Sequence, residues 1–65
     1  SDPDFFSAIK LCKRRRIGPC REESNRTLFY KKDIAILARS GFSYELSKKV
    51  LGLSKEAFKK FYTLI

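Results

Sequence analysis

The spacing of apolar positions along the chain predicts an all-α fold. In four segments, apolar side chains recur three or four residues apart, which is the period of an amphipathic helix. The predicted helices run from Pro3 to about Arg15, from a start between Asn25 and Leu28 to Ser40, from Ser43 to Leu51, and from Ser54 to near the C-terminus. We therefore expect one domain, a small bundle of three to four short helices.

The segment Lys31–Leu51 is central to this prediction, because it reads as a helix, a sharp turn and a second helix. Gly41 can end the first of these helices, since glycine adopts positive φ without steric cost. Ser43 and Ser54 each offer a hydroxyl group that caps the helix that follows. At the start of the chain, Asp2 stands in the capping position of the first predicted helix.

Large apolar side chains on the inward faces of these helices form the predicted core. Its members are Phe5, Phe6, Ile9, Phe29, Ile34, Leu37, Phe42, Leu46, Val50, Leu51, Phe58 and Phe61. Gly18 and Pro19 interrupt the helical pattern after the first helix. The single domain over residues 1–65 therefore divides into a first helix with a basic end (1–16), a loop (17–26), and a helical hairpin with a C-terminal helix (27–65).

Net charge is the strongest compositional signal. Fifteen Lys and Arg residues face seven Asp and Glu residues, which gives a net charge of +8. Such a surface attracts nucleic acid, acidic proteins or anionic membranes. We favour nucleic acid, or a complex that contains it, as the class of partner.

The basic residues include one dense run without an acid, from Lys10 to Arg21. One or two cations suffice to complement the C-terminal end of a helix dipole, and four consecutive cations repel one another. The run therefore indicates an anion-binding patch rather than a solvated helix end. The main candidates for partner contact are Lys13, Arg14, Arg15, Arg16 and Arg21, and the secondary candidates are Lys31, Lys32, Lys48 and Lys49.

Catalytic and metal chemistry are not indicated. The chain has no His, no glycine-rich phosphate loop and no closely paired carboxylates. The isolated acids Asp33, Glu45 and Glu56 stand at positions compatible with the surface. Two cysteines cannot complete a tetrahedral zinc site, so Cys12 and Cys20 are interpreted as small buried apolar residues, with a disulfide between them left open. We expect no enzyme activity, no metal and no cofactor.

A helix-turn-helix domain that binds duplex DNA directly is the alternative. Two helices joined by a glycine-containing turn match its outline. The details fit less well, because a small residue is usual where Leu37 stands and an apolar residue is usual where Ser47 stands. The outward positions of the second helix are predicted to be Tyr44, Glu45, Ser47 and Lys48. These positions include no Arg, Asn or Gln to pair bidentately with bases.

Two motifs together resemble the C-terminal part of bacterial RecX proteins, in particular those of the alphaproteobacterial type. The first is an arginine-rich helix end followed by Ile-Gly-Pro, at residues 14–19, and the second is Leu-x-x-x-Gly-Phe-Ser, at residues 37–43. Apolar residues follow at the positions that the family uses, namely Leu46, Val50 and Leu51. The resemblance implies a three-helix unit with a preceding helix, and a fragment of a longer protein in which such units are repeated in tandem.

The same resemblance implies a partner and a function. It implies binding to the RecA recombinase filament on DNA, with inhibition or tuning of strand exchange and coprotease activity. We therefore expect a noncatalytic regulatory module of DNA recombination, DNA repair and the SOS response, whose partners are the RecA filament and the DNA backbone. A cytoplasmic monomer is expected, without membrane contact and without a small-molecule substrate.

Overall fold

The computed structural model describes residues 2–64 and confirms the all-α prediction. Its elements are α1 (Asp2–Arg15), the 3₁₀-helix η1 (Gly18–Cys20), α2 (Glu23–Leu28), α3 (Tyr30–Arg39), α4 (Tyr44–Leu51) and α5 (Lys55–Thr63). The side chain of Asp2, with its predicted capping role, lies outside the described part of the chain, as do residues 1 and 65. Within residues 2–64, no helix has the length and apolar character needed to cross a membrane.

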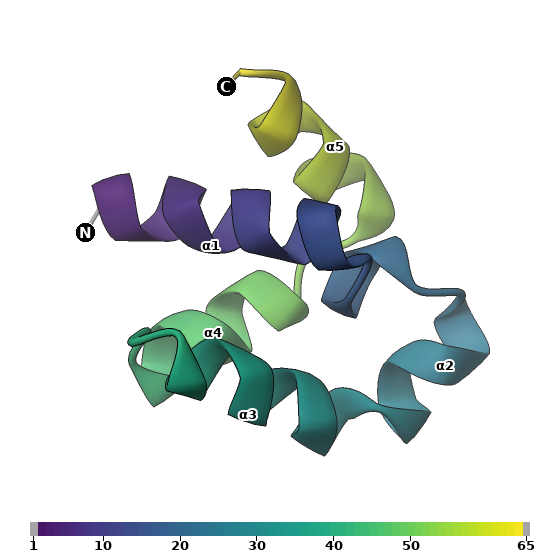
Figure 1. Ribbon diagram of the computed structural model, residues 1–65. Coiled ribbons are helices and arrows are strands. Elements are labelled where there is room, and N and C mark those ends of the chain that lie inside the picture. Colours follow the sequence, from purple (N-terminus) through teal and green to yellow (C-terminus); the bar gives the residue numbers. More distant parts are fainter. Residues whose placement is uncertain (1, 65) are drawn as a thin grey trace.

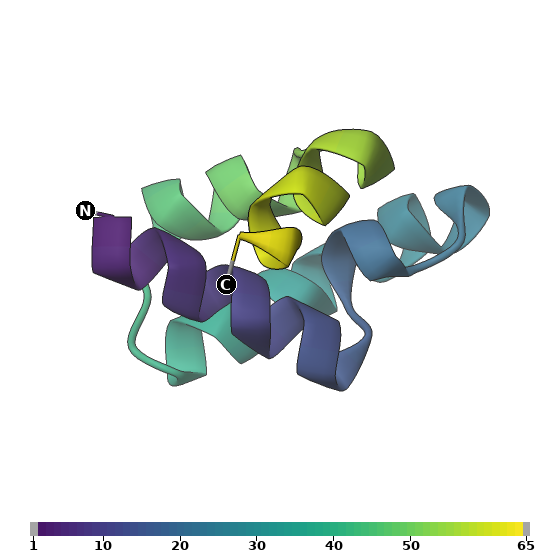
Figure 2. The ribbon, with the colours of Figure 1, turned by 90° about the horizontal axis from the view of Figure 1, so that it is seen from above.

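Helix α1 crosses the middle of the molecule and separates two groups of helices (Figure 1). It packs against α5 on one side and against α4 on the other, and α4 packs in turn against α3. The segment formed by η1 and α2 occupies the end of the molecule at which α1 finishes. Figure 2, which shows the molecule from above, places α2 at this same end, to one side of the other helices.

The buried core lies where α1, α3, α4 and α5 meet. Its apolar members are Ala8, Ile9, Leu11, Cys12, Ile17, Leu37, Val50, Leu51 and Phe58. Burial is thus confirmed for five predicted core residues, namely Ile9, Leu37, Val50, Leu51 and Phe58. Five others are half-buried and pack against this core, namely Phe5, Ile34, Phe42, Leu46 and Phe61.

Phe6 and Phe29 were predicted in the core but are only half-buried, at its margin. The Phe6 ring stands edge-on to the rings of Phe5 and Phe61, with centroids 5.5 and 6.1 Å away. Cζ of the Arg21 guanidinium group lies over the Phe29 ring, 4.4 Å from the centroid of that ring. Phe6 therefore makes edge-on contacts with other aromatic rings, and Phe29 offers the face of its ring to a cation. In both cases the neighbouring side chains are themselves partly exposed.

The turn between α3 and α4 forms at the predicted glycine. Gly41 has a φ of +98°, a backbone conformation that only glycine adopts easily. Around it, the N–H of Phe42 donates to the carbonyl oxygen of Leu37 (3.1 Å), and the N–H of Gly41 donates to that of Ala38 (3.0 Å). This pair of bonds is a Schellman motif, which satisfies the last carbonyl groups of a helix.

Both predicted serine caps are confirmed. The hydroxyl oxygen of Ser43 accepts a hydrogen bond from the N–H of Leu46 (3.1 Å), and that of Ser54 accepts one from the N–H of Ala57 (3.0 Å). Each bond satisfies one of the free N–H groups at a helix start and typically stabilises the helix by about 1 kcal/mol. The caps therefore fix where α4 and α5 begin.

Helix α1 ends in a similar turn, but an arginine occupies the left-handed position. The N–H of Ile17 donates to the carbonyl oxygen of Cys12 (3.0 Å), and the N–H of Arg16 donates to that of Lys13 (3.3 Å). Arg16 has a φ of +58°, a region that costs a non-glycine residue about 1–2 kcal/mol. Gly18 follows with a φ of +61°, so the chain reverses sharply into η1.

The predicted loop over residues 17–26 is wrong, because it contains η1 and the first four residues of α2. The predicted second helix is also divided at Phe29, whose φ of −103° and ψ of 14° separate α2 from α3. None of the α2 residues is buried, so apolar spacing carries no signal for this helix. Polar contacts to the rest of the molecule hold it instead.

Candidate partner-binding surface

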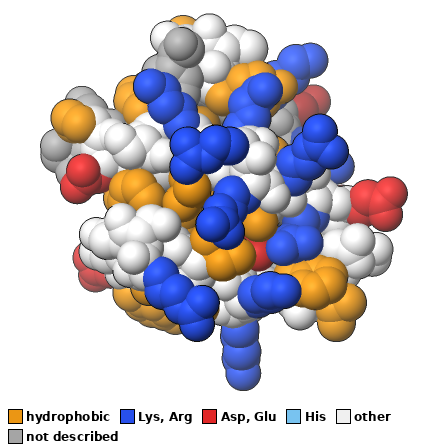
Figure 3. All heavy atoms as spheres, in the orientation of Figure 1, with side chains coloured by type: hydrophobic (Ala, Val, Ile, Leu, Met, Phe, Trp, Pro, Cys, Tyr) orange, Lys and Arg blue, Asp and Glu red, His pale blue; other side chains and the backbone are white. Residues whose placement is uncertain are grey.

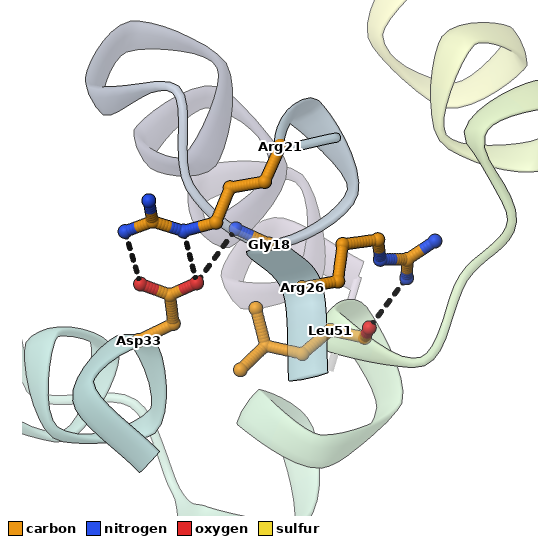
Figure 4. A network of polar contacts seen from close by, with 5 residues as sticks. All are labelled: Gly18, Arg21, Arg26, Asp33 and Leu51. Carbon is orange, nitrogen blue, oxygen red and sulfur yellow. Dashed lines mark hydrogen bonds and ion pairs between the residues drawn. The ribbon is translucent and has the colours of Figure 1, made fainter. Parts of the chain in front are cut away.

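A buried carboxylate joins the segment after α1 to α3. The side chain of Asp33 is only 1% exposed, and Oδ2 accepts hydrogen bonds from the backbone N–H of Gly18 (3.0 Å) and from Nε of Arg21 (2.8 Å). Oδ1 accepts a third, from Nη2 of Arg21 (2.8 Å). We call these three residues the Asp33 network (Figure 4). The predicted surface position of Asp33 is wrong, and its burial is tolerated because the charge is paired and hydrogen-bonded.

Arg21 therefore holds the fold together instead of facing a partner. Nε and Nη2 of its guanidinium group both donate to the Asp33 carboxylate, in the bidentate geometry that carboxylates favour. The hydrogen bond to Asp33 raises the pKa of Arg21, so the arginine side of this ion pair stays charged throughout the neutral range. Because this side chain is committed to Asp33, we remove Arg21 from the candidate surface.

Arg26 is a second structural arginine. Its Nη2 donates to the carbonyl oxygen of Leu51, the last residue of α4 (2.7 Å; Figure 4). The same atom also donates to the carbonyl oxygen of Leu53, two residues beyond the helix (2.6 Å). A cation at this position satisfies carbonyl groups that have no partner within the helix and complements the helix dipole. No local pattern predicts the contact, since its partners lie 25 and 27 residues farther along the chain.

The other members of the main candidate patch remain on the surface. Lys13, Arg14, Arg15 and Arg16 are all exposed at the end of α1. Within the described part of the chain, the side-chain ion pairs are Arg21–Asp33 and Arg26–Glu23, so none of these four cations has an acidic partner. The arginine run is thus available to an external anion.

Two adjoining hollows extend this patch onto α5. One, of about 420 Å³, is lined by four cations, Lys13, Arg16, Lys55 and Lys59, together with Pro19, Cys20, Phe58 and Tyr62. The other, of about 570 Å³, is lined by Lys10, Lys13, Arg14, Tyr62 and Thr63. We call the two together the α1–α5 groove. None of the described side chains that line it is acidic.

The whole face that Figure 3 shows carries many Lys and Arg side chains. They cover its middle, over α1 and toward α5, whereas the acidic side chains lie mostly at its edges. Lys55 and Lys59 were not among the predicted site residues. Only the packing of α5 against α1 brings them beside the arginine run, and the sequence carries no signal for this packing.

The secondary candidates lie away from the α1–α5 groove. They are exposed on α3 and α4, and the hollows that they line are different ones. Lys31 lines a hollow beside Arg26 and Leu28, and Lys49 lines one beside Phe5. Lys32 and Lys48 have their Nζ atoms near aromatic rings, those of Phe29 (5.9 Å) and Tyr44 (5.3 Å) respectively. Because the structure does not join these lysines to the arginine run, the contact surface that we propose leaves them out.

The α3–α4 pair has the outline of a helix-turn-helix, with one correction to its predicted surface. Ser47 is fully buried, not outward, and its hydroxyl group donates to the carbonyl oxygen of Ser43 (2.8 Å). A small side chain with its hydrogen bond satisfied within the helix can replace the apolar residue usual at this site. The exposed residues of α4 are Tyr44, Glu45, Lys48 and Lys49, so Lys49 takes the place of Ser47 in the predicted outward set.

The two cysteines are free and differ in environment. Cys12 is completely buried, and this burial, with smaller contributions from Cys20 and Asp33, raises the pKa of its thiol to about 12. Cys20 is half-buried in the floor of the α1–α5 groove. Burial raises the pKa of its thiol as well, but the neighbouring cations Lys13 and Lys55 oppose that effect. The predicted burial is thus confirmed for Cys12 and is partial for Cys20.

We expect iodoacetamide to modify Cys20 at least roughly tenfold faster than Cys12 at pH 8, because the thiolate is the reactive form. Mass spectrometry of peptides from the folded protein, sampled over time, measures the two rates. In concentrated guanidinium chloride the difference should disappear, since both thiols are then exposed. Equal rates in the folded protein would contradict the burial of Cys12.

Across residues 2–64, no three His, Cys, Asp or Glu side chains come together as they would to hold a metal ion. The exposed cations and aromatic rings of the surface can bind anions and stack planar rings. Comparisons with models of protein families, with curated proteins and with solved structures found no match to this chain.

Proposed function

We propose that this chain is a noncatalytic RecX-like module that binds the RecA–DNA filament and inhibits its activity. The observation that carries the proposal is the exposed run Lys13–Arg16, which ends α1 without an acidic partner among the described residues. The motifs at residues 14–19 and 37–43, with their resemblance to RecX proteins, direct the choice of partner toward the filament.

The physical basis of the proposal is electrostatic. A recombinase filament surrounds DNA phosphates with protein, so a basic module is drawn toward it and the association rate falls as salt increases. The Asp33 network and the Arg26 contacts hold the segment after α1 against α3 and α4. The arginine run is therefore presented on a rigid support, which reduces the entropy lost on binding.

Direct binding of duplex DNA is the second candidate, and the Schellman turn at Gly41 with the capped start of α4 favours it. In a helix-turn-helix the second helix reads base edges in the major groove. The exposed side chains of α4, however, include an acid and no Arg, Asn or Gln, which are the usual bidentate partners of G and A. We therefore rank this function below filament binding.

We expect the double variant Arg14→Glu, Arg15→Glu to bind the filament at least about tenfold more weakly than the unmodified chain. The comparison is made at about 0.15 M salt, which is close to physiological ionic strength. Affinity should fall because the variant reverses the charge of two exposed side chains within the arginine run. Fluorescence anisotropy with labelled RecA–DNA filaments measures the affinity. Far-UV circular dichroism should show unchanged helicity, although acids at the end of α1 oppose the helix dipole slightly.

The matched control is Lys31→Glu, Lys32→Glu, which changes the net charge equally but on α3, away from the arginine run. This control should retain most of the affinity. Equal losses in both variants would mean that total charge, not the arginine run, governs binding. Tight and sequence-selective binding to duplex DNA without RecA would instead favour the second candidate.

A further inference from the structure

We propose that the α1–α5 groove binds a single strand of nucleic acid directly, with phosphates contacted by Arg16, Lys55 and Lys59 and a base stacked on Tyr62. This inference goes beyond filament binding, because it requires no RecA and adds residues of α5. Three independent observations support it: the convergence of charge, the backbone of Arg16 and the place of Tyr62.

The first observation is that cations from two distant parts of the sequence converge on one hollow. Lys13 and Arg16 come from the end of α1, and Lys55 and Lys59 come from the first two turns of α5. They line both walls, and none of the described side chains that line the groove is acidic. A chain of phosphates lying in the groove would be contacted from both sides, which is how basic channels follow a nucleic-acid backbone.

The second observation is that Arg16 occupies a backbone position suited to glycine. Its φ of +58° places it at the left-handed end of α1, where glycine is most common. The side chain at this position is one of the cations of the groove. Backbone strain of this kind tends to occur at functional sites. Arginine at this position adds a cation to the groove, although glycine would end the helix with less backbone strain.

The third observation is that Tyr62 lines both hollows. The ring is half-buried and is supported by Phe58, whose centroid lies 5.5 Å away in an edge-on arrangement. Nζ of Lys13 lies 4.7 Å from the centroid of the Tyr62 ring. This lysine has a long flexible stem, so a base can take its place over the ring while the ammonium group moves to a phosphate.

An aromatic ring among cations favours an unpaired strand over a duplex. Bases of a single strand are free to stack on protein side chains, and each such contact is worth roughly 1–3 kcal/mol to proteins that bind single strands. Bases in a duplex already stack on one another and offer only phosphates to the groove. The groove should therefore distinguish the two forms, whereas charge alone should not.

The test measures binding of fluorescein-labelled oligonucleotides by anisotropy, with the whole chain and no RecA. The probes are oligo(dT), oligo(rU) and a mixed-sequence DNA duplex, each about 20 nucleotides or base pairs long. We expect at least one single strand to bind about fivefold or more tightly than the duplex. The tighter of the two single strands identifies DNA or RNA as the source. Equal or tighter duplex binding would overturn the proposal.

Arg16→Gly is the most informative variant, because it separates binding from folding. Glycine is better suited to the left-handed backbone, so the melting temperature should not fall. Affinity for the single strand should nevertheless drop, since a groove cation is lost. A fully folded Arg16→Gly protein with unchanged affinity would remove Arg16 from the site.

Two further variants test the walls and the ring. Lys55→Gln, Lys59→Gln should weaken single-strand binding about tenfold and reduce its salt dependence, whereas the matched control Lys31→Gln, Lys32→Gln should have a much smaller effect. Tyr62→Phe should bind normally, and Tyr62→Leu should lose about fivefold in affinity for the single strand but not for the duplex. If the two lysine variants lose equally, or if Tyr62→Leu binds as well as Tyr62→Phe, the groove assignment is wrong.

The failure of this proposal can be told apart from failure of the proposed function. A chain that binds filaments through Arg14 and Arg15 but does not bind oligonucleotides would contradict only the groove. A chain that binds single strands without RecA, and gains nothing when RecA is added, would contradict only filament binding.

Discussion

Replacing Asp33 with alanine should lower the free energy of unfolding by about 3–5 kcal/mol, the usual cost of removing one partner of a buried ion pair. The variant leaves the N–H of Gly18 and two donors of Arg21 without the acceptor that they share. A chain of this length has a total stability of only about 3–10 kcal/mol. The Asp33→Ala variant should therefore lose a large share of its total stability and unfold at a much lower urea concentration, as titration followed by circular dichroism would show.

The second ion pair of the described chain provides the control. Glu23 is 78% exposed on its side chain and lies 3.4 Å from Arg26, so Glu23→Ala should change stability by less than about 1 kcal/mol. A further arm combines Asp33→Ala with Arg21→Ala. The double variant should cost less than the sum of the two single variants, because each single variant leaves the other group unpaired. Additive losses would mean that the two side chains are not coupled.

Gly18→Ala should destabilise the fold by about 2–5 kcal/mol, from two causes. Gly18 has a φ of +61°, where alanine costs about 1–2 kcal/mol. A Cβ atom at this position would also overlap Cδ2 of Leu51, and overpacking of a core costs about 1–3 kcal/mol. Leu51 is only 4% exposed, so its side chain has little room to move away. Thermal unfolding measures the loss.

A double-mutant cycle separates the clash from the backbone strain. Leu51→Ala removes the atom that the new Cβ would meet, at its own cost of about 2–5 kcal/mol. Adding Gly18→Ala to that background should then cost only the backbone part, about 1–2 kcal/mol. If Gly18→Ala costs the same in both backgrounds, the close approach of η1 to α4 does not contribute.

Features of the fold that depend on near neighbours in the sequence were predictable. The caps at Ser43 and Ser54 and the turn at Gly41 involve bonds between residues three to five positions apart, and a local pattern contains everything that such bonds require. The start of α2 at Glu23 and its separation from α3 at Phe29 were missed. None of the α2 residues is buried, and its Arg26 donates to acceptors in a distant part of the chain. The spacing of apolar residues does not predict a helix that is held to the fold by polar contacts.

The candidate surface shows the same division. The run Lys13–Arg16 could be identified from the sequence, because its four basic residues are consecutive and stand at the end of a predicted helix. Arg21 has the same side chain as its neighbours in that run, and only its buried partner Asp33 shows that it has a different role. Lys59 could not be assigned to the site from the sequence, since the packing of α5 against α1 depends on the whole fold.

The crowding of cations along the α1–α5 groove also has a consequence for the protein on its own. Like charges held close together raise the free energy of the folded chain, whereas the unfolded chain can spread them apart. An anion that binds the groove of the folded form and not the unfolded chain adds about 2.7 kcal/mol to stability at a hundred times its dissociation constant. For so small a domain that is a sizeable share of the total. Occupancy of the groove and resistance to unfolding are thus linked, and the bound chain should be the one that better survives heat and proteolysis.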